Sequence, residues 1–390
     1  MSFNIPFSGR SLAYQENETQ AVLDAMNGAT PLTQGRYRDL FERRMREYLG
    51  SAHTFAVNNA TSALELSAQL CLLGPQDEVI IPTHTYTSSA YPFLKQGAKI
   101  VWADIDLTTR VVNAEEIEKK ITSNTRAIVV VHLYGYGADM PAIMELAKAH
   151  NLLVIEDAAQ TLGVMIDGKM AGTYGDFGIF SFHSHKNITT LGEGGLLCTD
   201  REEIANLIPM LRHNGHCGFG EKQEFYWKPA MGNVDLPELN GNALWPNNFC
   251  LGEVECALGI ELLKRNDLIN TQKRSRAHHF IDNLAQFEQL EFHRVDNERH
   301  NYHLLVARFL DGRRDKFMKT MAEKEGIQCV VQYCPLHRYP LYRKSGYGEA
   351  DCPNAETFFD NMVSFPFHHM LSDEEFDTLL DATSRILRKF

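Results

Sequence analysis

The sequence predicts an α/β fold with a mostly parallel sheet and a smaller α/β domain at the C-terminal end. Three observations support this prediction. Apolar runs of strand length alternate with helix-type segments in the N-terminal half of the chain. These runs are nearly continuous, which is typical of strands that are covered on both faces. The chain has 390 residues, enough to bury a large core and to divide into two domains.

The apolar runs predict the strands of the sheet, and the segments between them predict its helices. Strands are expected at residues 78–81, 100–103, 127–131, 152–155, 177–182 and 195–198, and helices at 62–70, 114–121 and 141–150. Parallel neighbours in a sheet need a crossover connection, which is usually a helix. The alternation therefore predicts a sheet lying between helices.

The second half of the chain has a different pattern. Residues 214–248 are rich in Gly, Asn, Pro and aromatic residues, and a segment this long without periodicity is expected to cover a site or to reach a neighbouring subunit. Helices are then predicted at 252–263 and 268–284. Short strands at 290–293 and 304–307, with helices at 314–325 and 373–388, predict the smaller C-terminal domain.

Composition excludes several classes of protein. The net charge of −12 argues against a nucleic-acid partner, because binding to a phosphate backbone needs concentrated cations. No apolar run is long enough to span a membrane, and the N-terminus lacks a signal-peptide pattern, so a cytoplasmic protein is expected. The eight Cys include no C-x-x-C pair and predict free thiols. No metal site is predicted, because Cys217, His213 and His216 lack a second ligand pair.

Two residues that follow predicted strands point to a specific chemistry. Lys186 comes after the run 177–182, and Asp157 closes the run that extends from residue 152 to Glu156. Taken alone, Lys186 would be expected to be solvated like most lysines, and Asp157 to lie in a loop. However, strand ends are where ligands bind in open α/β sheets. A lysine that forms a Schiff base and an acid that pairs with a pyridinium nitrogen are what pyridoxal 5'-phosphate (PLP) needs from a protein.

Other residues suit the remaining parts of this cofactor. The segment 58–64 places small and hydroxyl residues, among them Ala60 and Thr61, at the start of a predicted helix, where backbone amides bind phosphate. The alternative role for Thr61 is a plain helix cap. Ser181 is a second candidate for the phosphate. Tyr86, just after a strand, could stack on the cofactor ring.

The chain resembles the DegT-type PLP-dependent sugar aminotransferases, which act on nucleotide-linked keto sugars. The resemblance covers about residues 10 to 385. It runs through Leu32-Thr33-Gln34-Gly35, 74–80, Asp104-Ile105-Asp106, Val131-His132-Leu133-Tyr134-Gly135, Glu156-Asp157-Ala158-Ala159-Gln160, 180–195, Pro353-Asn354-Ala355-Glu356 and Ser364-Phe365-Pro366.

The resemblance implies a fold, with a large PLP-binding domain at 1–265 and a small C-terminal domain at 266–390. The large domain would hold a seven-stranded-type sheet between helices.

The resemblance also implies the roles of individual residues. Lys186 matches the Schiff-base lysine, Asp157 the acid at the pyridine nitrogen, Gln160 a residue beside the ring and Tyr86 the stacking aromatic. Ala60, Thr61 and Ser181 match phosphate-binding positions.

Asn248 matches an asparagine that family members lend to the phosphate across a dimer interface. The resemblance therefore implies a homodimer with shared active sites.

The resemblance also implies a reaction. An amino group would be transferred from an amino acid, expected to be L-glutamate, to a keto group of a nucleotide-linked deoxysugar. The product would serve surface-polysaccharide, lipopolysaccharide or related amino-sugar synthesis.

Two other functions stay open at this point. Some relatives carry His in place of the lysine and dehydrate keto sugars at carbon 3, and His185 lies directly before Lys186. A regulatory protein that binds PLP without catalysis is the other alternative, although it would not need both Lys186 and Asp157. Arg36, Tyr37 and His337 are candidates for contacts with the substrate.

Overall fold

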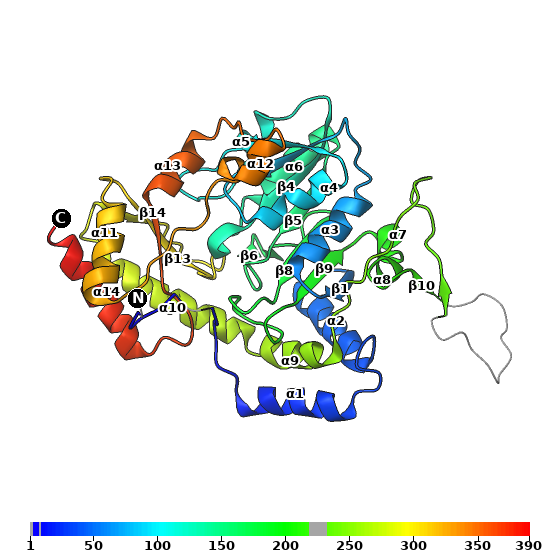
Figure 1. The fold of residues 1–390 in the computed structure, drawn as a ribbon, viewed down its shortest axis with the longest axis horizontal. Helices are drawn as coiled ribbons and strands as arrows, with labels where there is room; N and C mark the ends of the chain where they lie inside the picture. The colour runs from blue at the N-terminus through cyan, green and yellow to red at the C-terminus, as the bar shows by residue number, and fades with distance from the viewer. Residues whose placement is uncertain (1–2, 8, 218–231) are drawn as a thin grey trace.

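The computed structural model describes residues 3–7, 9–217 and 232–390, and Figure 1 shows their arrangement. Part of the long segment predicted to cover a site or reach a neighbouring subunit, residues 218–231, lies outside the described residues. Among the described residues, no helix is both long enough and apolar enough to cross a membrane.

A seven-stranded sheet forms the centre of the molecule. Its strands are β1 (His53–Val57), β2 (Glu78–Pro82), β3 (Lys99–Ala103), β4 (Thr125–Val131), β5 (Leu153–Asp157), β8 (Phe177–Ser181) and β9 (Gly195–Thr199), in the order β1-β9-β8-β5-β4-β2-β3. The pairs from β3 to β8 are parallel, and β9 runs antiparallel to both β8 and β1. The predicted α/β class with a mostly parallel sheet is confirmed.

Alternating side chains of the sheet are buried in two hydrophobic clusters. In β9, Leu197 belongs to the larger cluster, while Leu196 and Cys198 belong to a second cluster that also includes Phe41. Successive side chains of a strand point to opposite faces, so both faces of this sheet must be covered. Helices lie on both sides of it in Figure 1.

The α-helices of the described residues lie around the seven-stranded sheet and in the C-terminal part of the chain. They are α1 (Glu16–Gly28), α2 (Arg36–Leu49), α3 (Ala60–Leu70), α4 (Tyr91–Lys95), α5 (Ala114–Glu118), α6 (Met140–His150), α7 (Glu202–Ala205), α8 (Ile208–Leu211), α9 (Glu253–Leu263), α10 (Asn266–Leu284), α11 (Arg314–Thr320), α12 (Pro340–Lys344), α13 (Pro353–Asn361) and α14 (Asp373–Leu387). Small antiparallel pairs also form between β6 (Met165–Ile166) and β7 (Lys169–Met170), and between β10 (His216–Cys217) and β11 (Asn233–Val234).

A separate three-stranded antiparallel sheet lies in the C-terminal part. Its strands are β12 (Leu290–Phe292), β13 (Leu305–Phe309) and β14 (Met362–Phe365), in that order. Apolar residues of α10 and α14, including Phe280 and Leu379, pack on it in a third cluster. Ile5 from the N-terminal segment belongs to the same cluster. The division into residues 1–265 and 266–390 stays a prediction.

Candidate active site

A cavity of about 430 Å³ lies where the carboxyl ends of several central strands meet the start of α3. Val131, Asp157 and Ser181 are the last residues of β4, β5 and β8, and all three line it. This is the edge at which open α/β sheets bind ligands. The cavity also brings together the predicted catalytic and cofactor-binding residues Ala60, Thr61, Tyr86, Asp157, Gln160, Ser181 and Lys186. Asn248 is the one residue of that prediction that does not line it.

Asp157 is held in a fixed orientation at the end of β5. The side chain is 6% exposed. Its Oδ2 accepts a hydrogen bond of 2.6 Å from the Ser89 hydroxyl, and its Oδ1 accepts one of 3.2 Å from the Ala159 amide. Hydrogen bonds that satisfy a buried carboxylate offset part of its desolvation cost. The carboxylate is therefore oriented toward the cavity before any ligand binds.

Lys186 lies in the loop between β8 and β9 and lines the same cavity as Asp157. Burial lowers the pKa of Lys186 from the usual 10.5 to about 8, and the negative charge of Asp157 acts in the opposite direction. The loop is held by the Lys186 amide, which donates to the His183 carbonyl at 2.8 Å, and by the Ser11 hydroxyl, which donates to the Lys186 carbonyl. The result is a lysine that is deprotonated far more readily than a solvated one.

The start of α3 offers amides to an anion. The Asn59 side chain caps this helix by accepting from the Ser62 amide at 2.9 Å. The amides of Ala60 and Thr61 come earlier in the first turn and have no partner one turn back, so they are available to a phosphate. The Thr61 hydroxyl lies 2.9 Å from the Ser88 hydroxyl. It is a further donor to a phosphate bound at this turn.

The backbone of β9 approaches this turn very closely. A Cβ atom on Gly195 would lie 2.3–2.6 Å from backbone atoms of Asn59 and Ala60. Only glycine fits there, which explains the glycine at position 195. The close approach fixes the first turn of α3 against the strand end that carries the lysine loop.

Aromatic residues and an amide form another wall. Gln160 accepts a hydrogen bond of 2.6 Å from the Tyr134 amide, and its Nε2 lies 3.4 Å from the Tyr333 hydroxyl. Tyr86 is 55% exposed, and its ring lies 6.1 Å from that of Tyr333, edge to face. An exposed aromatic beside a buried acid and a lysine provides a surface on which a planar ring can lie.

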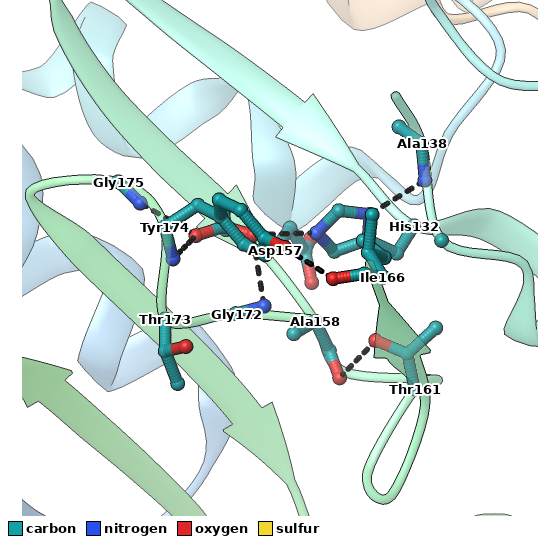
Figure 2. Close-up of polar contacts among 12 residues, drawn as sticks. His132, Ala138, Asp157, Ala158, Thr161, Ile166, Gly172, Thr173, Tyr174 and Gly175 are labelled. Atoms are coloured by element: carbon teal, nitrogen blue, oxygen red, sulfur yellow. Dashed lines mark hydrogen bonds and ion pairs between the residues drawn. The ribbon is translucent and has the colours of Figure 1, made fainter. Parts of the chain in front are cut away.

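Behind Asp157 lies a buried network that the sequence analysis missed. Glu156 is fully buried and accepts hydrogen bonds from the amides of Gly172, Tyr174 and Gly175 at 2.6–2.8 Å. Its Oε2 also lies 2.9 Å from Nε2 of His132. Figure 2 shows this loop and His132 around the strand end that carries Asp157. The only local signal was an acid next to Asp157 in a buried strand.

The contacts of His132 assign its tautomer. Its Nδ1 accepts from the Ala138 amide at 3.1 Å, so Nε2 carries the proton that faces Glu156 (Figure 2). The His132 amide also donates to the carbonyl of Asp157 at 3.1 Å. The network therefore ties β4, β5 and the loop at 171–175 into a rigid support for Asp157.

We expect Glu156→Gln to destabilise the fold by about 3 kcal/mol or more, because the new amide group would face donors and leave a buried network unpaired. Thermal or denaturant unfolding measures this change. Glu145→Gln, on the exposed face of α6, is the matched control and should leave stability unchanged. Equal stability of the two variants would show that the network has no structural role.

Several candidates from the sequence lie away from the cavity. Asn248 is exposed, and its backbone pairs with His213. Tyr37 is placed by its amide, which donates to Glu253, and Arg36 stacks on the Tyr37 ring. His337 is 7% exposed and lies between Thr83 and Glu356. Within the described residues no group of three His, Cys, Asp or Glu could hold a metal ion.

Residues distant in sequence complete the cavity. Phe7 and Ser11 come from the N-terminal segment, and His303, Phe367 and His368 come from the C-terminal part. The Ser11 amide donates to the Ser184 carbonyl at 3.0 Å, while the Ser11 carbonyl accepts from the His369 amide at 2.8 Å. The N-terminal segment thus joins the lysine loop to the C-terminal part.

Comparisons with known proteins agree with this geometry. The DegT/DnrJ/EryC1/StrS aminotransferase family matches residues 13–384. The GDP-perosamine synthase of Caulobacter vibrioides is 32% identical over 376 residues, which cover 95% of each chain. The dTDP-3-amino-3,6-dideoxy-alpha-D-galactopyranose transaminase of Aneurinibacillus thermoaerophilus is 32% identical over 377 residues, 96% of each chain. Spr1654 from Streptococcus pneumoniae is solved in PMP and PLP forms. Its PMP form superposes with a TM-score of 0.87 at 26% identity, covering 98% of this chain and 99% of that chain.

Proposed function

Because the chain belongs to the DegT/DnrJ/EryC1/StrS aminotransferase family, whose members are PLP-dependent transaminases, we propose that it transfers an amino group from L-glutamate to a keto group of a nucleotide-linked deoxysugar. The product would serve surface-polysaccharide or related amino-sugar synthesis. The observation that carries this proposal is the presence of Lys186 and Asp157 in one cavity, with the pKa of Lys186 lowered to about 8. The relatives act on GDP-linked and dTDP-linked sugars by name, so both nucleotide types are candidates.

The residues present fit PLP. When bound, PLP withdraws the electrons that are left when a C–H bond of the substrate breaks. Asp157 would hold a proton on the pyridine nitrogen, and its orientation by Ser89 would keep it there. Lys186 would bind the cofactor and then move a proton between substrate and cofactor carbons, for which a lowered pKa is needed. Tyr86 would lie against the ring, and Gln160 beside it.

The phosphate would bind at the start of α3. The donors proposed for it are the amides of Ala60 and Thr61 and the hydroxyls of Thr61 and Ser181, since these three residues line the cavity. Asn248 of a second subunit is the further donor proposed here. Its exposed position outside the cavity of its own chain is compatible with that role.

A homodimer with shared sites makes a specific prediction for mixed subunits. Lys186→Ala and Asn248→Ala variants should each be impaired alone. After the two are mixed and allowed to exchange subunits, one site of each heterodimer regains both residues, so activity should return. Activity that stays at the level of the separate variants would contradict the shared site.

The lowered pKa of Lys186 predicts how cofactor attachment depends on pH. Only the neutral amine attacks the PLP aldehyde, and the neutral fraction rises as pH rises toward the pKa. The rate of PLP attachment to apoenzyme should therefore increase about tenfold per pH unit below about 8 and level off above it, rather than rising up to 10.5. The growth of the visible cofactor band after mixing measures this rate. A rate that still climbs well above pH 8 would contradict the lowered pKa.

Acceptor specificity is tested by the enzyme in its amino form. Keto sugars linked to GDP and to dTDP are offered separately, and the return of the cofactor to its aldehyde form is followed by absorbance. Amination of one of them, with the amino sugar identified by mass spectrometry, supports the proposed acceptor class. Reaction with simple keto acids alone would contradict it.

A further inference from the structure

His303 and His368 form part of the cavity wall, and neither residue has a role in the proposed function. His303 lies just before β13, is 4% exposed and lines the cavity. His368 follows β14 on the way to α14 and also lines it. Both come from the C-terminal part, so they face the residues of the central sheet across the cavity. We call them the histidine wall.

The ring of His368 lacks partners. Its Nδ1 and Nε2 are both buried, and neither has a partner at hydrogen-bond geometry in the described part of the chain. Burial is the main cause that lowers the pKa of His368, and a weaker interaction with the Pro6 carbonyl opposes it. Buried polar groups are nearly always hydrogen-bonded, so such a ring in a cavity wall indicates a ligand that completes it.

The ring of His303 lies beside the lysine loop. Its Nδ1 is 3.4 Å from Oδ1 of Asn187, the residue after Lys186. The Asn187 amide group in turn donates to Asn270 at 2.8 Å, which fixes the side chain that faces the ring. The positive charge of Lys186 is the largest electrostatic effect that lowers the pKa of His303, after burial. A group held by His303 is therefore near the amine of Lys186.

A buried amine lies directly behind the histidine wall. Lys273 of α10 is 4% exposed, and its Nζ donates to the carbonyls of His303 at 2.8 Å and of Phe367 at 3.4 Å. Among the described residues no carboxylate forms an ion pair with Lys273. Burial lowers the pKa of Lys273 to about 7. An anion in the cavity would supply the negative charge that this amine lacks.

We propose that His303 and His368, with Lys273 behind them, bind the carboxylate of the amino donor that is attached to the amine-bearing carbon. This inference rests on the proposed transamination. The donor nitrogen must reach the cofactor atom to which Lys186 would bind. The carboxylate on the amine-bearing carbon must therefore lie close to the same atom. The histidine wall is next to Lys186 on one side and to Lys273 on the other, and among the described residues the ring of His368 has no hydrogen-bond partner of its own.

Histidine suits a site that must take two unlike substrates in turn. A neutral imidazole exchanges hydrogen bonds with the hydroxyl groups of a sugar, whereas a protonated one pairs with a carboxylate. An arginine would stay charged with both. The charged or titratable groups that act on these rings are Lys186, Lys273, His185 and His300 for His303, and Lys273, Arg276 and Glu375 for His368. Most of these groups are bases, and their protonated forms oppose protonation of the two rings until an anion arrives.

The test measures binding of glutarate, which has the carboxylates of glutamate without its amine, to the PLP-loaded enzyme by calorimetry. His303→Gln and His368→Gln should each weaken glutarate binding about tenfold or more, the usual effect of losing a hydrogen bond to a charged group. His369→Gln is the matched control, because His369 lies outside the cavity and contacts the Ile269 carbonyl. It should bind glutarate like the unchanged protein. GDP and dTDP binding should stay unchanged in all variants.

The possible results separate this inference from the proposed function. If L-glutamate converts the cofactor of the unchanged enzyme but both variants bind glutarate normally, the histidine wall is not the carboxylate site. Loss of nucleotide affinity in place of glutarate affinity would assign the wall to the sugar nucleotide and overturn the inference. If the unchanged enzyme neither binds glutarate nor reacts with glutamate, the proposed donor itself is wrong. Thermal unfolding of each variant establishes that it is folded. If one variant does not fold, the other variant, at a separate position, still tests the inference.

Discussion

Lys186→Ala is expected to slow the half-reaction with L-glutamate by about 10³-fold or more. The variant keeps Asp157 and the turn at the start of α3 that is proposed to bind the phosphate, so it should still bind PLP without a covalent bond. It loses the one lysine amine among the described residues that line the cavity, and a positioned acid–base group typically contributes 10²–10⁴-fold. Rapid-mixing absorbance, which follows the cofactor from its aldehyde to its amino form, measures the effect.

His185→Gln is the control for this prediction. His185 lines the cavity next to Lys186, but its ring contacts that of His183 at 4.9 Å. If Lys186 is the base, His185→Gln should retain most of the half-reaction. The opposite result, a large loss in His185→Gln with Lys186→Ala active, would favour the dehydratase chemistry in which a histidine acts at this position.

Asp157→Asn is expected to slow the same half-reaction by about 10²–10³-fold, because a neutral amide cannot keep the pyridine nitrogen protonated. PLP should still attach through Lys186. Because the charge of Asp157 raises the pKa of Lys186, its loss should lower that pKa further, and attachment should then level off at a lower pH. The two readouts separate loss of the acid from misfolding, since a misfolded variant would not bind PLP.

Ser89→Ala separates the charge of Asp157 from its orientation. This variant keeps the carboxylate and removes the hydroxyl that donates to it at 2.6 Å. We expect a loss of about tenfold, the usual effect of one hydrogen bond to a charged group. If Ser89→Ala slows the half-reaction as much as Asp157→Asn does, the position of the carboxylate, rather than its charge, limits the rate.

Strands buried on both faces were predictable from the sequence. The apolar runs from Glu78 to Cys198 produced β2, β3, β4, β5, β8 and β9, because such strands need no polar alternation. β1 was missed, since His53-Thr54-Phe55-Ala56-Val57 is short and begins with polar residues. Its place at the sheet edge depends on pairing with β9, which lies far along the chain.

The candidate site was predictable only where its residues lie in local motifs. Lys186, Asp157 and Thr61 each follow a strand or open a helix, so their roles could be expected. The histidine wall and Ser11 were missed because no local pattern marks them. They reach the cavity through the packing of the C-terminal part and the N-terminal segment, and this tertiary packing is not visible in sequence spacing.

The absorbance spectrum of the PLP-loaded protein before and after addition of L-glutamate tests the transamination itself. We predict that the visible band of the bound cofactor falls and that the band of its amino form rises, with release of 2-oxoglutarate. This outcome would establish the half-reaction and the donor together. A cofactor band that no amino acid changes, or a protein that never acquires the band with PLP present, would contradict the account.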